Sequence, residues 1–182
     1  MKGIADLKRL FFKYYSDNPA LRRIVTLHSE QVAIKALDIN RKKKLLLDPE
    51  EVYIAAMLHD IGVIKCNAPD IHAHGPLPYL RHGLEGEKIL KRNSFDKYAS
   101  ICATHTGAGI TANEIKSAGL PLPPVDLVPH TMLERLICYS DKFFSKSRDL
   151  KKEKSLDSVI AQMKKFGPDS YNRFMELQHL FN

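Results

Sequence analysis

The chain has 182 residues, few cysteines and no long apolar run, and both shortages exclude classes of protein. Cys66, Cys102 and Cys138 are isolated, odd in number and outside any CxxC pattern. We interpret them as small hydrophobic residues in a reducing cytoplasm, neither disulfide-bonded nor zinc-binding. No run approaches the roughly 18 apolar residues of a membrane span. Asp6 and Lys8 interrupt the N-terminal segment, so no signal peptide is evident and we expect no membrane partner.

Positive charge is in excess, with 28 Lys and Arg against 21 Asp and Glu, for a formal net charge of +7. Much of the excess lies in Arg41–Lys44 and in the segment from Lys142 to Lys154. We interpret these runs as a solvated helix end and an exposed linker, and the alternative is attraction of an anionic ligand. No pattern of stacking aromatic residues accompanies the charge, so we expect no nucleic-acid surface.

The hydrophobic periodicity is that of helices, with no convincing alternation typical of a strand. Together with a hydrophobic content of 44%, it predicts an all-α bundle forming a single domain over residues 1–182. The predicted helices cover about residues 3–15, 19–40, 49–62, 82–92, 95–104, a segment from Thr131 past Asp141, 155–165 and 168–181. Two stretches rich in proline and glycine, 66–81 and 107–129, are predicted loops.

Polar residues lie on the apolar faces of three predicted helices. The three stripes are Leu21, Val25, His28, Val32 and Ile39; Val52, Ala56 and His59; and Leu133, Ile137, Asp141 and Phe144. Polar side chains buried on separate helices need partners, because an unpaired buried charge is strongly destabilising. A shared divalent metal would satisfy all of them, whereas the alternative for any single histidine is a hydrogen-bonded core residue.

The second stripe ends in His59-Asp60-Ile61-Gly62, with His28 upstream and Asp141 downstream. In this order, over about residues 20–150, the chain resembles the HD-domain superfamily of metal-dependent phosphohydrolases, in its HDIG-signature branch. The resemblance implies an all-helical domain with a divalent metal held by His28, His59, Asp60 and Asp141. It also implies hydrolysis of phosphate esters or anhydrides, usually in nucleotides.

Two further histidines, His82 and His105, lie between the signature and Asp141. In HD proteins with two metals, such histidines complete a second site that Asp60 would bridge, and this pattern is similar to bacterial HD-type diadenosine tetraphosphate hydrolases. The alternatives are an exposed helix start for His82 and a capping or core role for His105. Nitrogen and oxygen donors suit iron, manganese, cobalt, nickel or zinc, and we favour one or two ions of iron or manganese.

The expected reaction is attack of a metal-activated hydroxide on a nucleotide or dinucleotide polyphosphate. Asp60 and Lys65 are the predicted catalytic residues, and Lys65, Thr106 and Arg148 the predicted substrate-binding residues. Several HD branches place a lysine closer behind the signature than Lys65, which leaves its role open. The remaining histidines, His72, His74, His130 and His179, are expected at the surface.

Named HD subfamilies with acidic residues after His-Asp, or with a Gly-Tyr-Pro motif, are not matched, since Ile61–Ile64 contains no acid and the motif is absent. Two alternatives stay open: a phosphomonoesterase acting on small molecules, and a metal-containing module that senses a nucleotide without turnover. The expected location is the cytoplasm, and a homodimer is also open.

Overall fold

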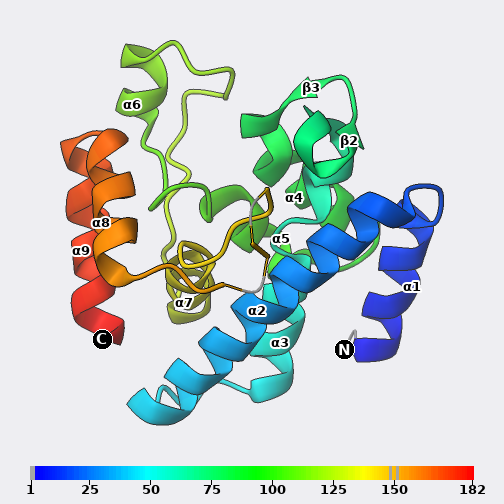
Figure 1. Cartoon of the computed structure of the whole chain (residues 1–182), viewed down its shortest axis with the longest axis horizontal. Helices are drawn as coiled ribbons and strands as arrows, with labels where there is room; N and C mark the ends of the chain where they lie inside the picture. Colours follow the sequence, from blue (N-terminus) through cyan, green and yellow to red (C-terminus); the bar gives the residue numbers. More distant parts are fainter. Residues whose placement is uncertain (1–2, 148, 151) are drawn as a thin grey trace.

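The computed structural model describes residues 3–147, 149–150 and 152–182, and most of these are helical (Figure 1). The helices are α1 (Ile4–Tyr15), α2 (Pro19–Lys43), α3 (Pro49–Leu58), α4 (His82–Arg92), α5 (Asp96–Thr104), α6 (Ala112–Ser117), α7 (Met132–Asp141), α8 (Leu156–Lys165) and α9 (Pro168–Phe181). The prediction of a largely helical fold is confirmed. Within the described ranges, no helix combines the length and the apolar character needed to cross a membrane.

Side-chain caps set the starts of the helices that carry the site. Asn18 accepts a hydrogen bond from the Leu21 amide at 3.0 Å at the start of α2, and Pro19 occupies the first turn. At the start of α7, Thr131 Oγ1 accepts from the Glu134 amide at 3.2 Å, and Glu134 Oε2 accepts from the Thr131 amide at 2.9 Å. This capping box fixes where α7 begins, and so where Asp141 lies ten residues later.

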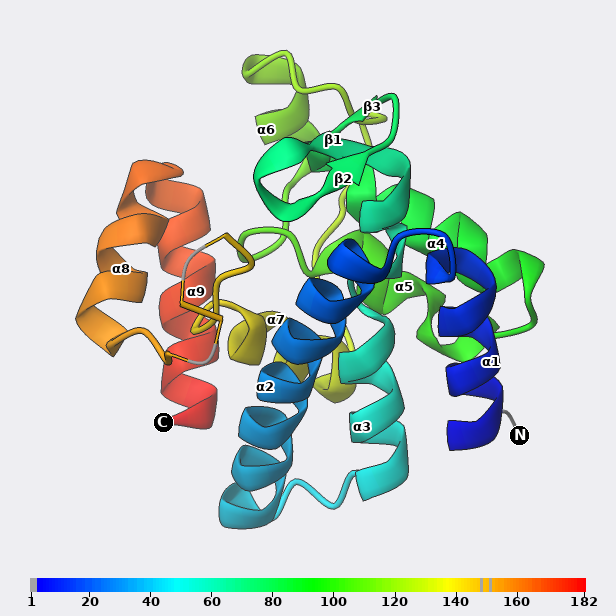
Figure 2. The same cartoon turned by 45° about the vertical axis from the view of Figure 1, so that its right-hand side comes forward.

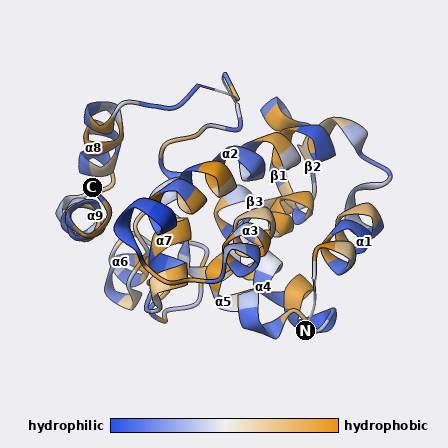
Figure 3. Ribbon diagram, turned by 90° about the horizontal axis from the view of Figure 1, so that it is seen from below, coloured by the Kyte–Doolittle hydropathy of each residue, from blue (hydrophilic) through white to orange (hydrophobic). Residues whose placement is uncertain are grey.

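The hydrophobic core runs through the whole bundle, from α1 to α9. Helix α2 packs on α3 and α7, and α4 packs on α5, while α1 and the α8–α9 pair lie on opposite sides of the molecule (Figures 1 and 2). Both hydrophobic and hydrophilic faces are visible along α1, α2 and α7, as amphipathic helices require (Figure 3). The buried Tyr15 hydroxyl donates to the Ile61 carbonyl at 3.0 Å, which ties α1 to the segment after His59-Asp60.

The predicted loop 66–81 contains a small sheet, so the all-α prediction needs correction. Strands β1 (Cys66–Ala68), β2 (Ala73–His74) and β3 (Leu77–Pro78) form a sheet in the order β2-β1-β3. Strand β1 pairs antiparallel with β2 and parallel with β3. Strands this short cannot show alternation of polar and apolar residues over several positions, so the pattern carried no signal.

The predicted loop 107–129 likewise contains a helix, α6. Its start is a second capping box, in which Thr111 Oγ1 accepts from the Glu114 amide at 3.2 Å and Glu114 Oε2 accepts from the Thr111 amide at 2.8 Å. The Thr-x-x-Glu pattern of α7 is therefore repeated here, and it was a usable signal that the surrounding prolines and glycines obscured.

Gly62 has a different role from the helix stop that the sequence predicted. Helix α3 already ends at Leu58, and Gly62 lies in the 3-10 helix η1 (Ile61–Lys65). A Cβ atom on Gly62 would fall 2.0 Å from the His82 carbonyl oxygen, and one on Gly83 would fall 2.4 Å from the Cys102 carbonyl oxygen. These glycines therefore let the backbones of η1, α4 and α5 pack in direct contact.

Candidate metal centre

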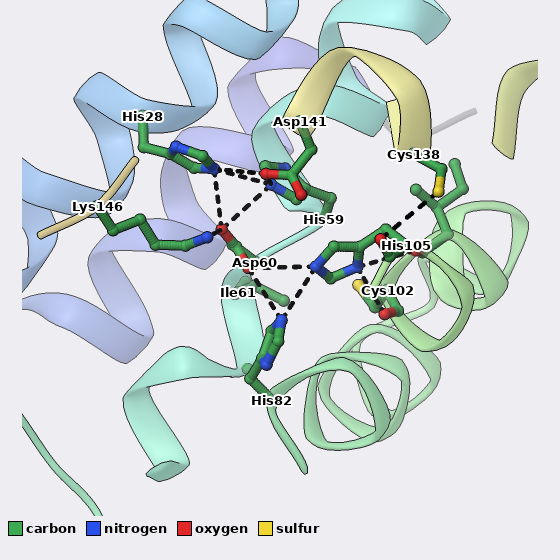
Figure 4. Close-up of polar contacts among 12 residues, drawn as sticks. His28, His59, Asp60, Ile61, His82, Cys102, His105, Cys138, Asp141 and Lys146 are labelled. Atoms are coloured by element: carbon green, nitrogen blue, oxygen red, sulfur yellow. Dashed lines mark hydrogen bonds and ion pairs between the residues drawn. The ribbon is translucent and has the colours of Figure 1, made fainter. Parts of the chain in front are cut away.

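Four histidines and two aspartates converge in the core from separate elements (Figure 4). They are His28 within α2, His59 at the end of α3, Asp60 directly after it, His82 at the start of α4, His105 at the end of α5 and Asp141 at the end of α7. All six side chains are buried. The structure thus brings together all six residues predicted as metal ligands.

Asp60 lies at the centre of this group, and its two oxygens face different partners. Oδ2 lies 3.3 Å from His28 Nε2 and 3.1 Å from His59 Nε2, whereas Oδ1 lies 3.4 Å from the Nε2 atoms of both His82 and His105. We call His28, His59, Asp60 and Asp141 site A, and Asp60, His82 and His105 site B. Within each site the possible ligand atoms lie within 4.8 Å of one another.

Backbone carbonyls fix the orientation of three of the four imidazole rings. The Nδ1 atoms donate as follows: His59 to Ala56 O at 2.6 Å, His82 to Tyr79 O at 2.7 Å, and His105 to Cys102 O at 2.8 Å. A neutral imidazole with its proton on Nδ1 has a lone pair on Nε2. In the neutral rings of His82 and His105 this Nε2 lone pair points at Asp60, which is the arrangement that metal-binding histidines adopt in proteins.

Site B places two lone pairs against each other. The Nε2 atoms of His82 and His105 are 3.0 Å apart. Burial lowers the pKa of His82 to about 3 and also lowers the pKa of His105, so both rings are neutral at ordinary pH. With both protons on Nδ1, neither ring can donate to the other across this gap. A cation bound by both nitrogens and by Asp60 Oδ1 would remove the repulsion, so these residues fit a divalent metal.

In site A, positive charges lie next to the two carboxylates. His28 Nε2 lies 2.9 Å from Asp141 Oδ1 and 3.3 Å from His59 Nε2. Burial disfavours the imidazolium of His59, but the negative charges of Asp60 and Asp141 outweigh it and raise the pKa of His59 to about 9. A protonated imidazole thus lies between two carboxylates, where a divalent metal would find two oxygen and two nitrogen donors.

The ammonium group of Lys146 contacts the shared carboxylate of this centre. Among the described residues no well-directed hydrogen bond reaches either Asp60 oxygen, but Lys146 Nζ lies 2.6 Å from Asp60 Oδ2 (Figure 4). Lys142 Nζ lies 2.7 Å from Asp141 Oδ2 and donates to the His105 carbonyl at 2.8 Å. After the opposing effect of burial, the charge of Lys146 is the main influence holding the pKa of Asp60 well below its usual value.

A cavity of about 520 Å³ opens beside site A, and we call it the lysine cavity. Its wall includes the metal-centre residue Asp141, the ring of Tyr79 and three lysines, Lys142, Lys146 and Lys154. Tyr79 also stacks on His82, with ring centroids 4.7 Å apart. Three lysines in the wall of one cavity suit an anionic ligand that reaches the metal centre.

The predicted substrate-binding residues have different positions. Lys65 is exposed and is not among the residues lining the lysine cavity, whereas Thr106 is half-buried beside His105 in the wall of a second cavity. Arg148 lies outside the described residues. Lys146, which the sequence analysis did not single out, is the lysine that contacts Asp60. Its signal was its place five residues after Asp141.

The interpretation of the segment from Lys142 to Lys154 as an exposed linker is corrected by these contacts for Lys142 and Lys146. Lys142 is 8% exposed and the Lys146 side chain is 14% exposed. The residues directly after α7 lie over the metal centre, so that Lys146 faces Asp60 and Lys142 faces Asp141, whereas Lys152 is exposed. By contrast, Arg41–Lys44 is exposed at the end of α2, as expected.

Other expectations for single residues agree with the structure. The three cysteines are buried and form no disulfide, and burial raises the pKa of the Cys66 and Cys138 thiols to about 11. The four remaining histidines, His72, His74, His130 and His179, are exposed. Neither group contributes a ligand to site A or site B.

The chain belongs to the HD domain family, whose model matches residues 25–146 and so contains all six converging residues. It is 31% and 29% identical to proteins named tRNA (cytidine(56)-2'-O)-methyltransferase from Picrophilus torridus and Thermoplasma volcanium, over 78% and 82% of this chain. The matches cover only 36% and 38% of those relatives.

A protein of Methanocaldococcus jannaschii, named as uncharacterized, is 33% identical over 69% of this chain and 64% of its own length. The chain therefore spans less than two thirds of each of these relatives. None of the three is named as a diadenosine tetraphosphate hydrolase, so the finer resemblance is not shown. No solved structure matches the chain significantly.

Proposed function

We propose that this chain is a metal-dependent phosphohydrolase that cleaves a phosphate ester or anhydride bond in a nucleotide or dinucleotide polyphosphate. The observation that supports it is the pair of sites that share Asp60 beside a cavity lined by lysines. Site A and site B would each hold one divalent transition metal, and iron or manganese suits their imidazole and carboxylate donors. We further propose that it acts in the cytoplasm on a small phosphorylated substrate, as a single domain.

Phosphoryl transfer asks the protein mainly for positioning and for stabilisation of charge. Bound divalent ions would supply an activated water and neutralise charge on the phosphoryl oxygens. Asp60 would contribute one oxygen to each site and so fix the position of the two sites relative to each other. The Lys146 ammonium, released from Asp60, would bind a phosphate oxygen at the mouth of the lysine cavity. Lys142 donates to the His105 carbonyl and so links site A to site B.

The names of the two methyltransferase relatives describe another reaction. Because this chain spans little more than a third of those proteins, their named activity does not transfer to it. The phosphomonoesterase and the nucleotide-sensing module remain the alternatives. Both metal sites keep a full set of buried ligands, which favours an enzyme over a sensor, and three lysines at one cavity favour a polyphosphate over a monoester.

A screen of phosphorylated metabolites with the metal-reconstituted protein tests the proposal, with phosphate release as the measurement. Nucleoside di- and triphosphates, dinucleoside polyphosphates and small monoesters form the panel. Release from nucleotide polyphosphates by the parent protein, and not by an Asp60→Ala variant, is the expected result. Release only from monoesters would establish the phosphomonoesterase, and binding without release would establish the sensing module.

A further inference from the structure

A second cavity, of about 470 Å³, lies between the loop that follows His105, helix α6 and the α8–α9 pair, and we call it the apolar cavity. Its wall contains the side chains of Leu80, Ile110, Leu120 and Phe166, with the hydroxyl-bearing residues Thr106 and Ser170 beside them. Phe166 is 56% exposed. A large aromatic ring left half in solvent, in a concave apolar wall, is a feature of ligand sites.

Residues that are close in sequence line the apolar cavity and the lysine cavity at two places. Tyr79 lines the lysine cavity and its neighbour Leu80 lines the apolar cavity. Gln162 of α8 lines the first and Phe166, the C-cap residue of α8, lines the second, and helical residues four apart lie on the same face. Thr106, in the wall of the apolar cavity, directly follows the candidate ligand His105. One molecule can therefore have a charged end in the lysine cavity and an apolar end in the apolar cavity.

The wall of the apolar cavity is fixed before any ligand binds. The Arg173 guanidinium on α9 donates to the Ala108 carbonyl at 3.2 Å and to the Gly109 carbonyl at 2.8 Å, and it pairs with the Glu114 carboxylate at 2.8 Å. Gly109 has a φ of +83°, and a Cβ atom there would lie 2.8 Å from Val128 Cα. The loop after His105 is thus held against α6 and α9 in one conformation.

We propose that the apolar cavity binds the nucleobase of the substrate, with Phe166 as the ring on which the base stacks. This inference rests on the proposed function, because it assigns the phosphates of the same molecule to the lysine cavity. A base is planar and apolar on its faces, with polar edges that Thr106 and Ser170 can meet. Stacking on an aromatic side chain strengthens binding by about tenfold to a hundredfold per base. Phe166 then distinguishes nucleotides from phosphates that lack a base.

The test compares binding of ligands with and without a base to the metal-loaded protein. The probes are the β,γ-imido analogues of ATP, GTP, CTP and UTP, whose β,γ linkage resists hydrolysis, and imidodiphosphate itself, all measured for binding with their integrity checked afterwards. Phe166→Ala is expected to weaken at least one nucleotide analogue by about tenfold or more and to leave imidodiphosphate unchanged. Phe12→Ala is the matched control, because Phe12 is 65% exposed on α1 and lines neither cavity.

A second variant, Ala118→Phe, fills the apolar cavity from its exposed wall and is expected to weaken the same analogue. Thermal unfolding of all three variants checks that they fold alike. Equal binding of every analogue to the parent and to Phe166→Ala, or no binding of any analogue, overturns the inference. Failure of the proposed function is a separate result, since phosphate release would be absent from every substrate while the effect of Phe166→Ala on binding remained.

Discussion

Site A and site B share Asp60, but the charges around their buried ligands differ. In site A the carboxylates already face cations, because His59 is protonated and Lys146 and Lys142 lie within 2.7 Å of Asp60 and Asp141. In site B the two imidazoles are neutral and face one oxygen of Asp60. Metal binding at site A therefore exchanges one positive charge for another, whereas at site B it adds charge. Two ions bound by one carboxylate should consequently respond differently to mutation and to pH.

The largest effect is expected from removing the residue that the sites share. Asp60→Ala deletes a ligand from both and leaves Lys146 without its partner, so metal content should fall from two ions per chain to none. Phosphate release should fall by at least about a thousandfold, more than the loss of a single hydrogen-bond donor costs. Elemental analysis and activity measure the two outcomes. Asp157→Ala, at an exposed aspartate of α8, is the control. An Asp60→Ala protein with its metals intact would contradict both sites.

Removing site B alone should separate the two sites. The double variant His82→Ala and His105→Ala is expected to retain one ion per chain and the fold, because site A keeps all four of its ligands. Activity should fall by more than the roughly tenfold to hundredfold that loss of a hydrogen-bond partner of a metal ligand costs. The matched control replaces the exposed His72 and His74, and metal content should not change. Two ions retained in the His82→Ala, His105→Ala variant would contradict the assignment of site B.

A change of pH should alter the metal affinity of site A and leave that of site B nearly unchanged. Because the pKa of His59 is about 9, a metal must displace its proton at any pH below that value, and a rise in pH favours binding. Between pH 6 and pH 8 the affinity of site A for Mn²⁺ should increase by about a hundredfold, tenfold for each unit. The pKa of His82 is about 3, so no proton competes there over this range. Titration of the His82→Ala, His105→Ala protein measures site A alone, and a slope near zero would contradict the assignment of a proton to His59.

The smallest effect should come from the lysine that occupies site A. Lys146→Met removes an ammonium that a metal must displace from Asp60, so metal affinity should rise, by roughly tenfold. Replacement of a true metal ligand would lower the metal affinity, so the direction of the change distinguishes the two roles. Lys65→Met, at an exposed lysine, is the control and should leave metal affinity unchanged. Phosphate release by the two variants then tests which lysine contacts substrate. A loss confined to Lys65→Met would support the role that the sequence alone predicts for Lys65.

The six converging residues could be predicted because their signal is local. His28, His59 and Asp141 lie on apolar stripes and Asp60 follows one, and the order of all six along the chain is that of a known family. Lys146 could not be predicted in the same way, since its contact with Asp60 joins residues 86 positions apart and depends on how the segment after α7 folds back. Lys65 was favoured because it is close to the signature in sequence, yet η1 leaves its side chain at the surface.

The small sheet and helix α6 are secondary-structure elements that the sequence pattern could not predict. Strands of two or three residues carry no periodicity, so β1, β2 and β3 depend on contacts that the sequence pattern does not contain. Helix α6 has a readable start at Thr111, but six residues are too few for a stripe of apolar positions to appear.

The close contact between Gly62 and α4 determines how far apart the two sites lie. An ordinary carbon–oxygen contact needs about 3.5 Å, and a methyl group on Gly62 would lie 2.0 Å from the carbonyl of His82. Relief of that overlap would displace the start of α4 by more than 1 Å, on the order of five times the roughly 0.2 Å within which metal–ligand bonds normally vary. The dimensions of the metal centre therefore depend on the absence of a side chain at Gly62 as much as on the six ligand side chains. A single added carbon at position 62 would change the spacing of the sites without replacing any ligand.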